Sequence, residues 1–163
     1  IEGTNVSVGR GTDTPFELLG APWINARELA GYLNARLISG VRFIPVQFTP
    51  TSSKFANQLC NGVNIVVLDR YGLDAPTLGI ELATALHKLY PNDFQMQKML
   101  EILANQATYD ALVAAKDPRW ITASWHDALQ EFQQTRQKYL LYASQPKPAM
   151  TPPVSSSSPS APR

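Results

Sequence analysis

Several features that are common in chains of this size are missing here. The sequence has one cysteine, Cys60, so no disulfide can form within the chain, and a single thiol carries no information about the redox state of its compartment. The formal net charge is only +1. This argues against a dedicated nucleic-acid-binding protein, because such proteins usually carry a strong basic excess. No apolar run approaches the roughly 18 residues that a membrane-spanning helix needs, so the sequence shows no membrane span.

Motifs for metals and nucleotides are also lacking. The two histidines, His87 and His126, lie on separate predicted helices, with no neighbouring cysteine and no HExxH spacing. The glycine-rich run near the start does not have the GxxxxGKS/T spacing of a phosphate loop, and no amphipathic helix follows Gly9-Arg10-Gly11. We therefore expect no metal and no cofactor. The lone cysteine is interpreted as a small core residue.

Residues 143–163 differ in composition from everything before them. Six of these 21 residues are proline and six are serine. Such a segment cannot bury enough apolar surface to offset the entropy of ordering it. We expect a disordered tail here, and a folded part over residues 1–142 that is long enough for one domain with a sizeable core.

Apolar periodicity predicts an α+β fold, in which a small sheet or partial barrel of short strands packs with three to four helices. Strands are predicted over residues 41–48 and 64–68 from short β-branched and aromatic runs. Pro45 marks the first of them as an edge strand or a bulged one. Residues 15–23 are predicted to be an irregular apolar connector.

Helices are predicted over residues 25–37, 77–90, 106–115 and 118–141. Asn25 is a typical N-cap, and Pro118 is typical of a first helical position. In the last helix, the stripe predicted to face the core is Ile121, Trp125, Leu129, Phe132 and Tyr139.

The most informative segment is residues 2–12, with the sequence EGTNVSVGRGT. It has no helical periodicity, and its three glycines permit close approach of the backbone. The side chains that can bond a polar ligand are Glu2, Asn5, Ser7, Arg10 and Thr12. This composition fits a ligand-binding loop, and it fits equally well a structural turn whose polar groups bond one another. Because the run starts at residue 2, we expect the chain to be the downstream part of a longer polypeptide.

A second polar segment, TPTSSK at residues 49–54, directly follows the predicted strand 41–48. Thr49 and Lys54 are at the end of that strand, and Arg42 alternates with Phe43 so that its side chain points away from the core face. These three side chains are candidates to line a polar cleft. A solvated loop is the alternative interpretation.

These segments resemble the family of bacterial exo-β-N-acetylmuramidases, the NamZ-type peptidoglycan hydrolases. The resemblance is carried by residues 2–12, 15–17 (PFE), 20–23 (GAPW), 40–43 (GVRF), 48–54 (FTPTSSK), 60–63 (CNGV), 69–70 (DR), 89–91 (LYP) and 139–142 (YLLY). These blocks occur in order and with compatible spacing over residues 1–142. The Pro/Ser-rich tail lies outside the resemblance.

The resemblance implies a two-domain glycosidase, of which residues 1–142 are the smaller α+β C-terminal domain. A Rossmann-like N-terminal domain, absent from this chain, would carry the catalytic carboxylate and act as a partner across the cleft. The implied activity is release of N-acetylmuramic acid from the non-reducing ends of peptidoglycan fragments, with a periplasmic or secreted location. The isolated chain would then be inactive or nearly so.

The resemblance also suggests roles for the candidate residues. Arg10, Arg42 or Lys54 would pair with the lactyl carboxylate of muramic acid. The acetamido group and hydroxyls would bond to Asn5, Ser7, Thr12 and Thr49. Glu2 would assist catalysis or orient Arg10, and we favour orientation or substrate binding. The alternative is a non-catalytic module that binds peptidoglycan fragments or packs against another domain.

Overall fold

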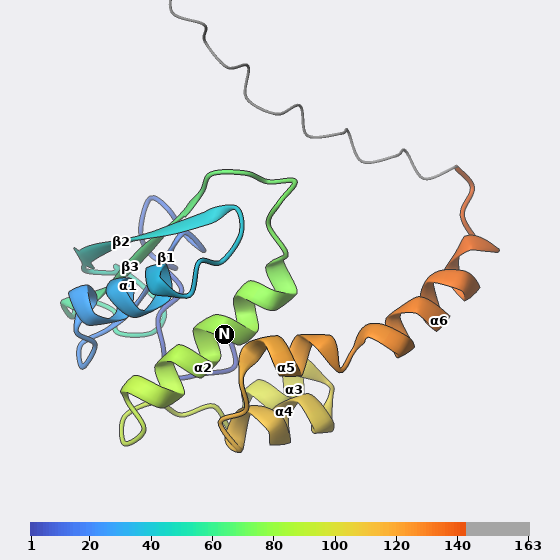
Figure 1. The fold of residues 1–163 in the computed structure, drawn as a ribbon. Coiled ribbons are helices and arrows are strands. Elements are labelled where there is room, and N and C mark those ends of the chain that lie inside the picture. The colour runs from blue at the N-terminus through green and yellow to red at the C-terminus, as the bar shows by residue number, and fades with distance from the viewer. Residues whose placement is uncertain (143–163) are drawn as a thin grey trace, which may run out of the picture.

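Residues 1–142 form a three-stranded sheet and six helices in the computed structural model (Figure 1). This part of the chain is all that the structure describes, so the predicted tail over 143–163 lies outside the described residues. The α+β class predicted from the sequence is confirmed. No helix among the described residues is long and apolar enough to cross a membrane.

The sheet is antiparallel, with β3 (Cys60–Val67) between β1 (Leu18–Ala21) and β2 (Val41–Phe48). β2 has the predicted bounds and is an edge strand, as Pro45 indicates. Pro45 lies opposite Val63, and the N–H that proline lacks matters least at an edge.

The prediction of an irregular connector over 15–23 is wrong, because β1 lies within it. β1 has only four residues, and it exists because Asn61–Asn64 of β3 pair with it from far along the chain. Gly20 lies opposite Gly62, and a Cβ at Gly62 would overlap the carbonyl oxygen of Leu19. This close backbone approach extends β3 to Cys60, four residues before its predicted start.

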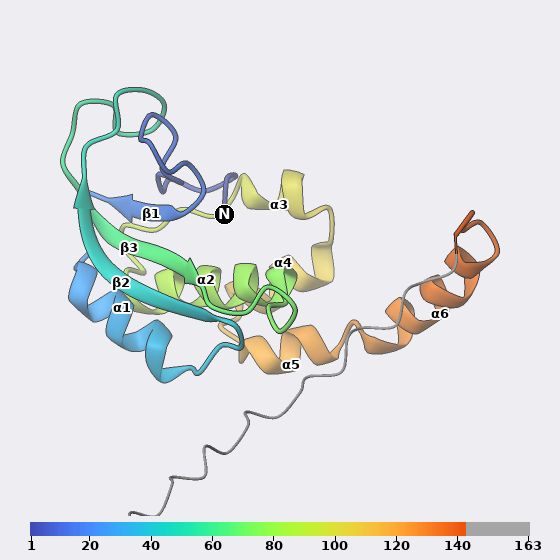
Figure 2. The same cartoon turned by 90° about the horizontal axis from the view of Figure 1, so that it is seen from above.

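Two helices form the layer against the sheet (Figure 2). α1 (Ala26–Ala35) packs against β2 and β3, and α2 (Ala75–Leu89) packs against α1. Asn25 caps α1 as predicted, since its side chain accepts a hydrogen bond from the Glu28 N–H at 3.3 Å. Five of the largest fully buried side chains come from these layers: Leu19, Leu29, Leu33, Val63 and Leu86.

The C-terminal third consists of short helices. They are α3 (Met99–Leu103), α4 (Gln106–Val113), α5 (Pro118–Ala123) and α6 (His126–Gln137). α4 and α5 pack against α2, whereas α6 projects away from the body (Figures 1 and 2). α3 was not predicted, because five residues are too few to show a helical period.

The single helix predicted over 118–141 is wrong, because the chain breaks at Ser124 and Trp125. The Ser124 hydroxyl donates to the carbonyl of Ile121 at 2.6 Å, and the Trp125 indole N–H donates to the Thr108 hydroxyl of α4 at 2.9 Å. These bonds end α5 and turn the chain. Only Ile121 of the predicted inner stripe is buried, and no residue of α6 is.

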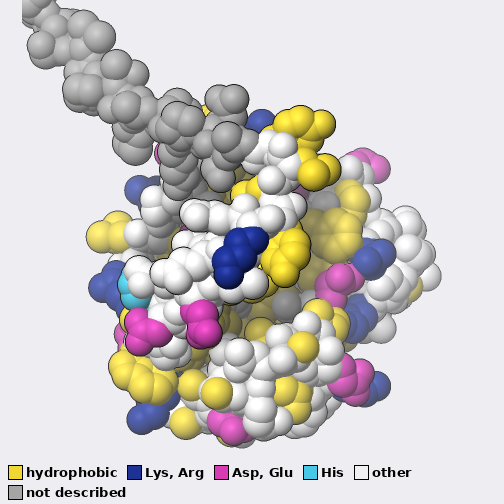
Figure 3. All heavy atoms as spheres, turned by 90° about the vertical axis from the view of Figure 1, so that its right-hand side faces the viewer, with side chains coloured by type: hydrophobic (Ala, Val, Ile, Leu, Met, Phe, Trp, Pro, Cys, Tyr) yellow, Lys and Arg dark blue, Asp and Glu magenta, His cyan; other side chains and the backbone are white. Residues whose placement is uncertain are grey.

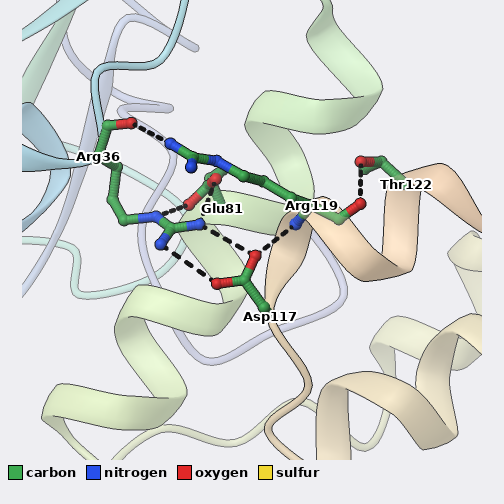
Figure 4. A network of polar contacts seen from close by, with 5 residues as sticks. All are labelled: Arg36, Glu81, Asp117, Arg119 and Thr122. Atoms are coloured by element: carbon green, nitrogen blue, oxygen red, sulfur yellow. Dashed lines mark hydrogen bonds and ion pairs between the residues drawn. The ribbon is translucent and has the colours of Figure 1, made fainter.

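An ion-pair network joins α1, α2 and α5 (Figure 4). The Arg36 guanidinium donates to both carboxylate oxygens of Glu81, at 2.8 and 2.9 Å, and lies 3.3 Å from Asp117. Glu81 is only 4% exposed. The backbone N–H of Arg119, and then Arg36, hold the pKa of Asp117 below its ordinary value. The network therefore fixes α5 against the two main helices.

Candidate functional site

Residues 2–12 fold as successive turns beside β1. Ser7 and Gly20 exchange backbone hydrogen bonds of 2.8 and 3.0 Å, which ties the middle of the run to the sheet edge. Gly9 and Gly11 have φ values of 76° and 84°, a region that glycine enters without strain. The Thr12 hydroxyl donates to the Gly9 carbonyl at 2.6 Å and closes the last turn.

The second polar segment packs directly on this loop. The backbone N–H and the hydroxyl of Thr51 both donate to the Gly11 carbonyl, at 2.8 and 2.9 Å. The Lys54 ammonium donates to the carbonyl of Glu2 at 2.8 Å and to the carbonyl of Thr4. The two segments singled out in the sequence therefore meet in space.

A third segment, around residues 93–98, joins them through Asn5. The Asn5 amide donates to the Asp93 carbonyl at 2.7 Å, and its oxygen accepts from the Gln95 N–H at 2.8 Å. The backbone N–H of Asn5 also donates to the Gln95 carbonyl at 3.2 Å. Asn5 thus holds the segment before α3 against the loop.

The three segments enclose a cleft of about 320 Å³. Its lining residues are Glu2, Gly3, Thr4, Asn5, Lys54, Gln95, Gln97 and Lys98. Gln95, Gln97 and Lys98 were missed by sequence reasoning, because nothing local marks an exposed segment between two helices as part of a site. Within the described residues, Lys98 makes no ion pair.

Positive charge predominates around the cleft. Burial is the main cause that lowers the pKa of Lys54, and the nearby ammonium group of Lys98 lowers it further. Glu2 is the carboxylate among the lining residues. Its oxygen accepts from the Nη2 and Nε of Arg10, at 2.7 and 3.1 Å, and the guanidinium lies 4.9 Å from the ring centre of Phe16.

The hydrogen bond from Arg10 lowers the pKa of Glu2. A carboxyl group that acts as a general acid needs a raised pKa instead. Glu2 is therefore ionised at neutral pH, and its geometry suits it to orient Arg10.

The other candidates lie elsewhere. Ser7 is 2% exposed, and its hydroxyl accepts from the Gly9 N–H at 3.3 Å, so it is a structural residue of the turn. Thr12 is likewise engaged within its turn. Thr49 is exposed after β2 and is not among the lining residues. Arg42 is at the opposite end of β2, about 23 Å from Thr49 at the usual rise of a strand, so the structure does not bring these two together.

A larger hollow of about 740 Å³ lies at the start of α1. Its amides are already paired, since Gln47 donates to Asn61 at 2.7 Å and Asn25 caps the helix. Arg27 is the charged residue of its lining. We prefer the smaller cleft as the functional site because it gathers both polar segments and their charges. Among residues 1–142, no three His, Cys, Asp or Glu side chains are grouped to hold a metal ion.

Comparison with known proteins places this chain in a family. The family model described as "Exo-beta-N-acetylmuramidase NamZ, C-terminal" matches residues 1–142. The chain is 40% identical over 145 residues to the peptidoglycan beta-N-acetylmuramidase NamZ of Bacillus subtilis (strain 168), a match that covers 87% of this chain and 35% of the relative.

Two crystal structures of DUF1343 family proteins from Bacteroides fragilis have the same fold. One has a TM-score of 0.63 at 28% identity over 88% of this chain and 38% of the other. The second has a TM-score of 0.64 at 23% identity over 85% of this chain and 38% of the other, and it supports the fold alone. The chain spans little more than a third of these proteins. It belongs to the NamZ exo-β-N-acetylmuramidase family and corresponds to its C-terminal part.

Proposed function

We propose that this chain forms one wall of the substrate cleft of an exo-acting glycoside hydrolase, which releases N-acetylmuramic acid from the non-reducing ends of peptidoglycan fragments. The observation that carries the proposal is the cationic cleft, in which Lys54 and Lys98 flank side-chain amides beside the Glu2–Arg10 pair. The Bacillus subtilis relative is a peptidoglycan beta-N-acetylmuramidase, which supports this substrate class.

The lining residues match the groups of muramic acid. The lactyl carboxylate needs a cation, and Lys98 offers an ammonium that makes no ion pair in the described chain. Lys54 already donates to two carbonyls and has one N–H left for a ligand. The side chains of Gln95 and Gln97 supply donors and acceptors for the acetamido group and hydroxyls.

The cleft holds only part of a hydrolytic site. Glycoside hydrolysis usually requires two carboxyl groups on either side of the scissile bond, and Glu2 is the carboxylate among the lining residues. We assign Glu2 to positioning Arg10. We assign the catalytic carboxylate to an N-terminal Rossmann-like domain that is not part of residues 1–142. The isolated chain should therefore bind sugar without hydrolysing it. Because peptidoglycan lies outside the cytoplasmic membrane, we propose a periplasmic or secreted location.

An NMR titration of the ¹⁵N-labelled chain tests the proposal, with N-acetylmuramic acid as ligand and N-acetylglucosamine as control. Shifts specific for the muramic sugar are expected at residues 2–5, 54 and 95–98. Lys98→Gln should weaken binding about fivefold, as expected for a charged hydrogen bond weakened by solvent. Lys116→Gln is the matched control, because Lys116 lies over Trp120 and outside the cleft lining.

Equal shifts with both sugars, or unchanged binding by Lys98→Gln, would contradict the proposal. The alternative is a non-catalytic module that binds peptidoglycan fragments or packs against another domain. Arg10→Ala in the full-length protein separates the two. It should reduce turnover if the cleft contributes to catalysis and leave turnover unchanged if the chain is only a module.

A further inference from the structure

α6 carries an apolar face that nothing in the described chain covers. Leu129 and Phe132 are 52% and 60% exposed, and Tyr139, two residues beyond the end of α6, is 77% exposed. Trp125, Leu129 and Phe132 recur at the 3- to 4-residue spacing of one helix face. Figure 3 views the molecule from the side on which α6 projects, and shows hydrophobic side chains exposed there beside lysine and arginine side chains.

The length of α6 makes this exposure informative. The helix has 12 residues, and its N-cap, Trp125, makes no side-chain capping bond. Isolated helices of this length are marginal in water, and most helices in proteins are stabilised by packing of an apolar face. α6 buries no residue. The exposed apolar face of α6 is therefore available to pack against a partner, which would stabilise the helix.

The exposed face continues toward the start of the chain. A groove of about 390 Å³ is lined by Trp125, Leu129 and Phe132 together with residues of α4. Trp125 also borders a second groove of about 270 Å³, whose lining includes Ile1 and Ile102. Ile102 is 64% exposed. We call the joined surface of Ile1, Ile102, Trp125, Leu129 and Phe132 the apolar strip.

The relatives indicate what lies on the apolar strip. The chain covers 35% of the Bacillus subtilis relative, and its matching family model is the C-terminal part of that family. The match extends to residue 142, so it includes α6. In a longer relative, the polypeptide before the position of Ile1 would emerge beside this strip, because Ile1 borders one of its grooves.

We infer that the apolar strip is the docking surface for the preceding, N-terminal part of the polypeptide. In this arrangement α6 becomes ordered when it packs against that N-terminal part. The groove that Ile1 borders adjoins the sugar cleft, because Gly3 lines both, but the inference does not depend on sugar binding or turnover. Docking here would fix the orientation of the remainder of the protein relative to residues 1–142.

Hydrogen exchange followed by mass spectrometry tests the inference on two proteins. One is this chain, and the other is the same chain preceded by the part of the Bacillus subtilis relative that lies N-terminal to the match. Covalent linkage gives the two parts a millimolar effective concentration, so that weak docking is still observed. Amides of α6 should exchange at least tenfold more slowly in the fusion.

Phe132→Asp in the fusion should return the exchange of α6 to the rate of the chain alone. Gln134→Asp is the matched control and should leave it slow, because residue 134 is on the opposite side of the helix from 129 and 132 at 100° per residue. Neither position is buried, so the core is unaffected.

Equal exchange of α6 in both proteins, or protection that survives Phe132→Asp, would overturn the inference. So would concentration-dependent protection in the chain alone with a dimer mass by light scattering, because the occupant would then be a second copy. None of these readouts uses sugar binding or turnover, so failure here leaves the proposed function standing.

Discussion

Asn5 offers the sharpest test of how the cleft is built. Its side chain makes two hydrogen bonds, donating to the Asp93 carbonyl at 2.7 Å and accepting from the Gln95 N–H at 2.8 Å. Asn5→Ala removes both. A typical hydrogen bond contributes about 0.5–1.5 kcal/mol net. Because Asp93 and Gln95 are exposed and water can replace the lost partners, we expect a loss of about 1–2 kcal/mol.

The predicted loss has a local signature as well as a global one. Urea unfolding followed by tryptophan fluorescence measures the change in the global free energy of unfolding. Amide hydrogen exchange by NMR measures the local opening of the Gln95 N–H, which donates to the Asn5 side chain. A local loss of about 1–2 kcal/mol raises exchange at Gln95 by about 5–30-fold. Asn92→Ala is the control, since Asn92 is exposed and close in sequence, and it should change stability by no more than about 0.5 kcal/mol.

Unchanged exchange at Gln95 in Asn5→Ala would refute the reasoning, because the segment carrying Lys98 would then be held by something else. The prediction also affects how mutants in the cleft are interpreted. Loss of sugar binding in Asn5→Ala would reflect a loosened segment, whereas loss in Lys98→Gln would report direct contact with the ligand.

Three further predictions concern stability. Arg36→Met leaves the buried carboxylate of Glu81 without its partner and should cost about 3–5 kcal/mol in urea unfolding; the double variant Arg36→Met, Glu81→Met should recover most of it. Gly62→Ala places a Cβ against the carbonyl oxygen of Leu19 and should lower the free energy of unfolding by about 3 kcal/mol or more. The amides of β1 should also lose protection from hydrogen exchange. Burial raises the pKa of Tyr90 to about 12. The stability that the protonated Tyr90 hydroxyl contributes to the fold is therefore complete below the ordinary pKa of about 10 and is lost as the pH rises toward 12. Tyr90→Phe should therefore flatten the fall in stability above pH 10 by about 1–2 kcal/mol; an unchanged slope would contradict this origin.

Local sequence signals predicted those features that depend on neighbouring residues. Asn25 caps α1, and Asp117 with Pro118 begins α5, because capping is decided within one turn. Pro45 correctly indicated an edge strand, since a residue without an N–H is excluded from the sheet centre. The run of residues 2–12, with the later blocks, was enough to identify the family.

Features that depend on distant residues were missed or misjudged. β1 is too short to show a pattern and exists through its pairing with β3. The break between α5 and α6 depends on Trp125 reaching Thr108. Apolar periodicity predicted that this helix faces the core, and that prediction is wrong, because no residue of α6 is buried within residues 1–142.

The candidate site shows the same division. The sequence by itself determined that residues 2–12 and 49–54 are polar segments, the first of them rich in glycine, because composition is a local property. Only the tertiary structure decided that Lys54 contacts Glu2 and Thr4, that Arg42 lies far from Thr49, and that Lys98 completes the cleft. Those outcomes depend on how the sheet and helices pack, and packing is set by contacts between residues that are tens of positions apart.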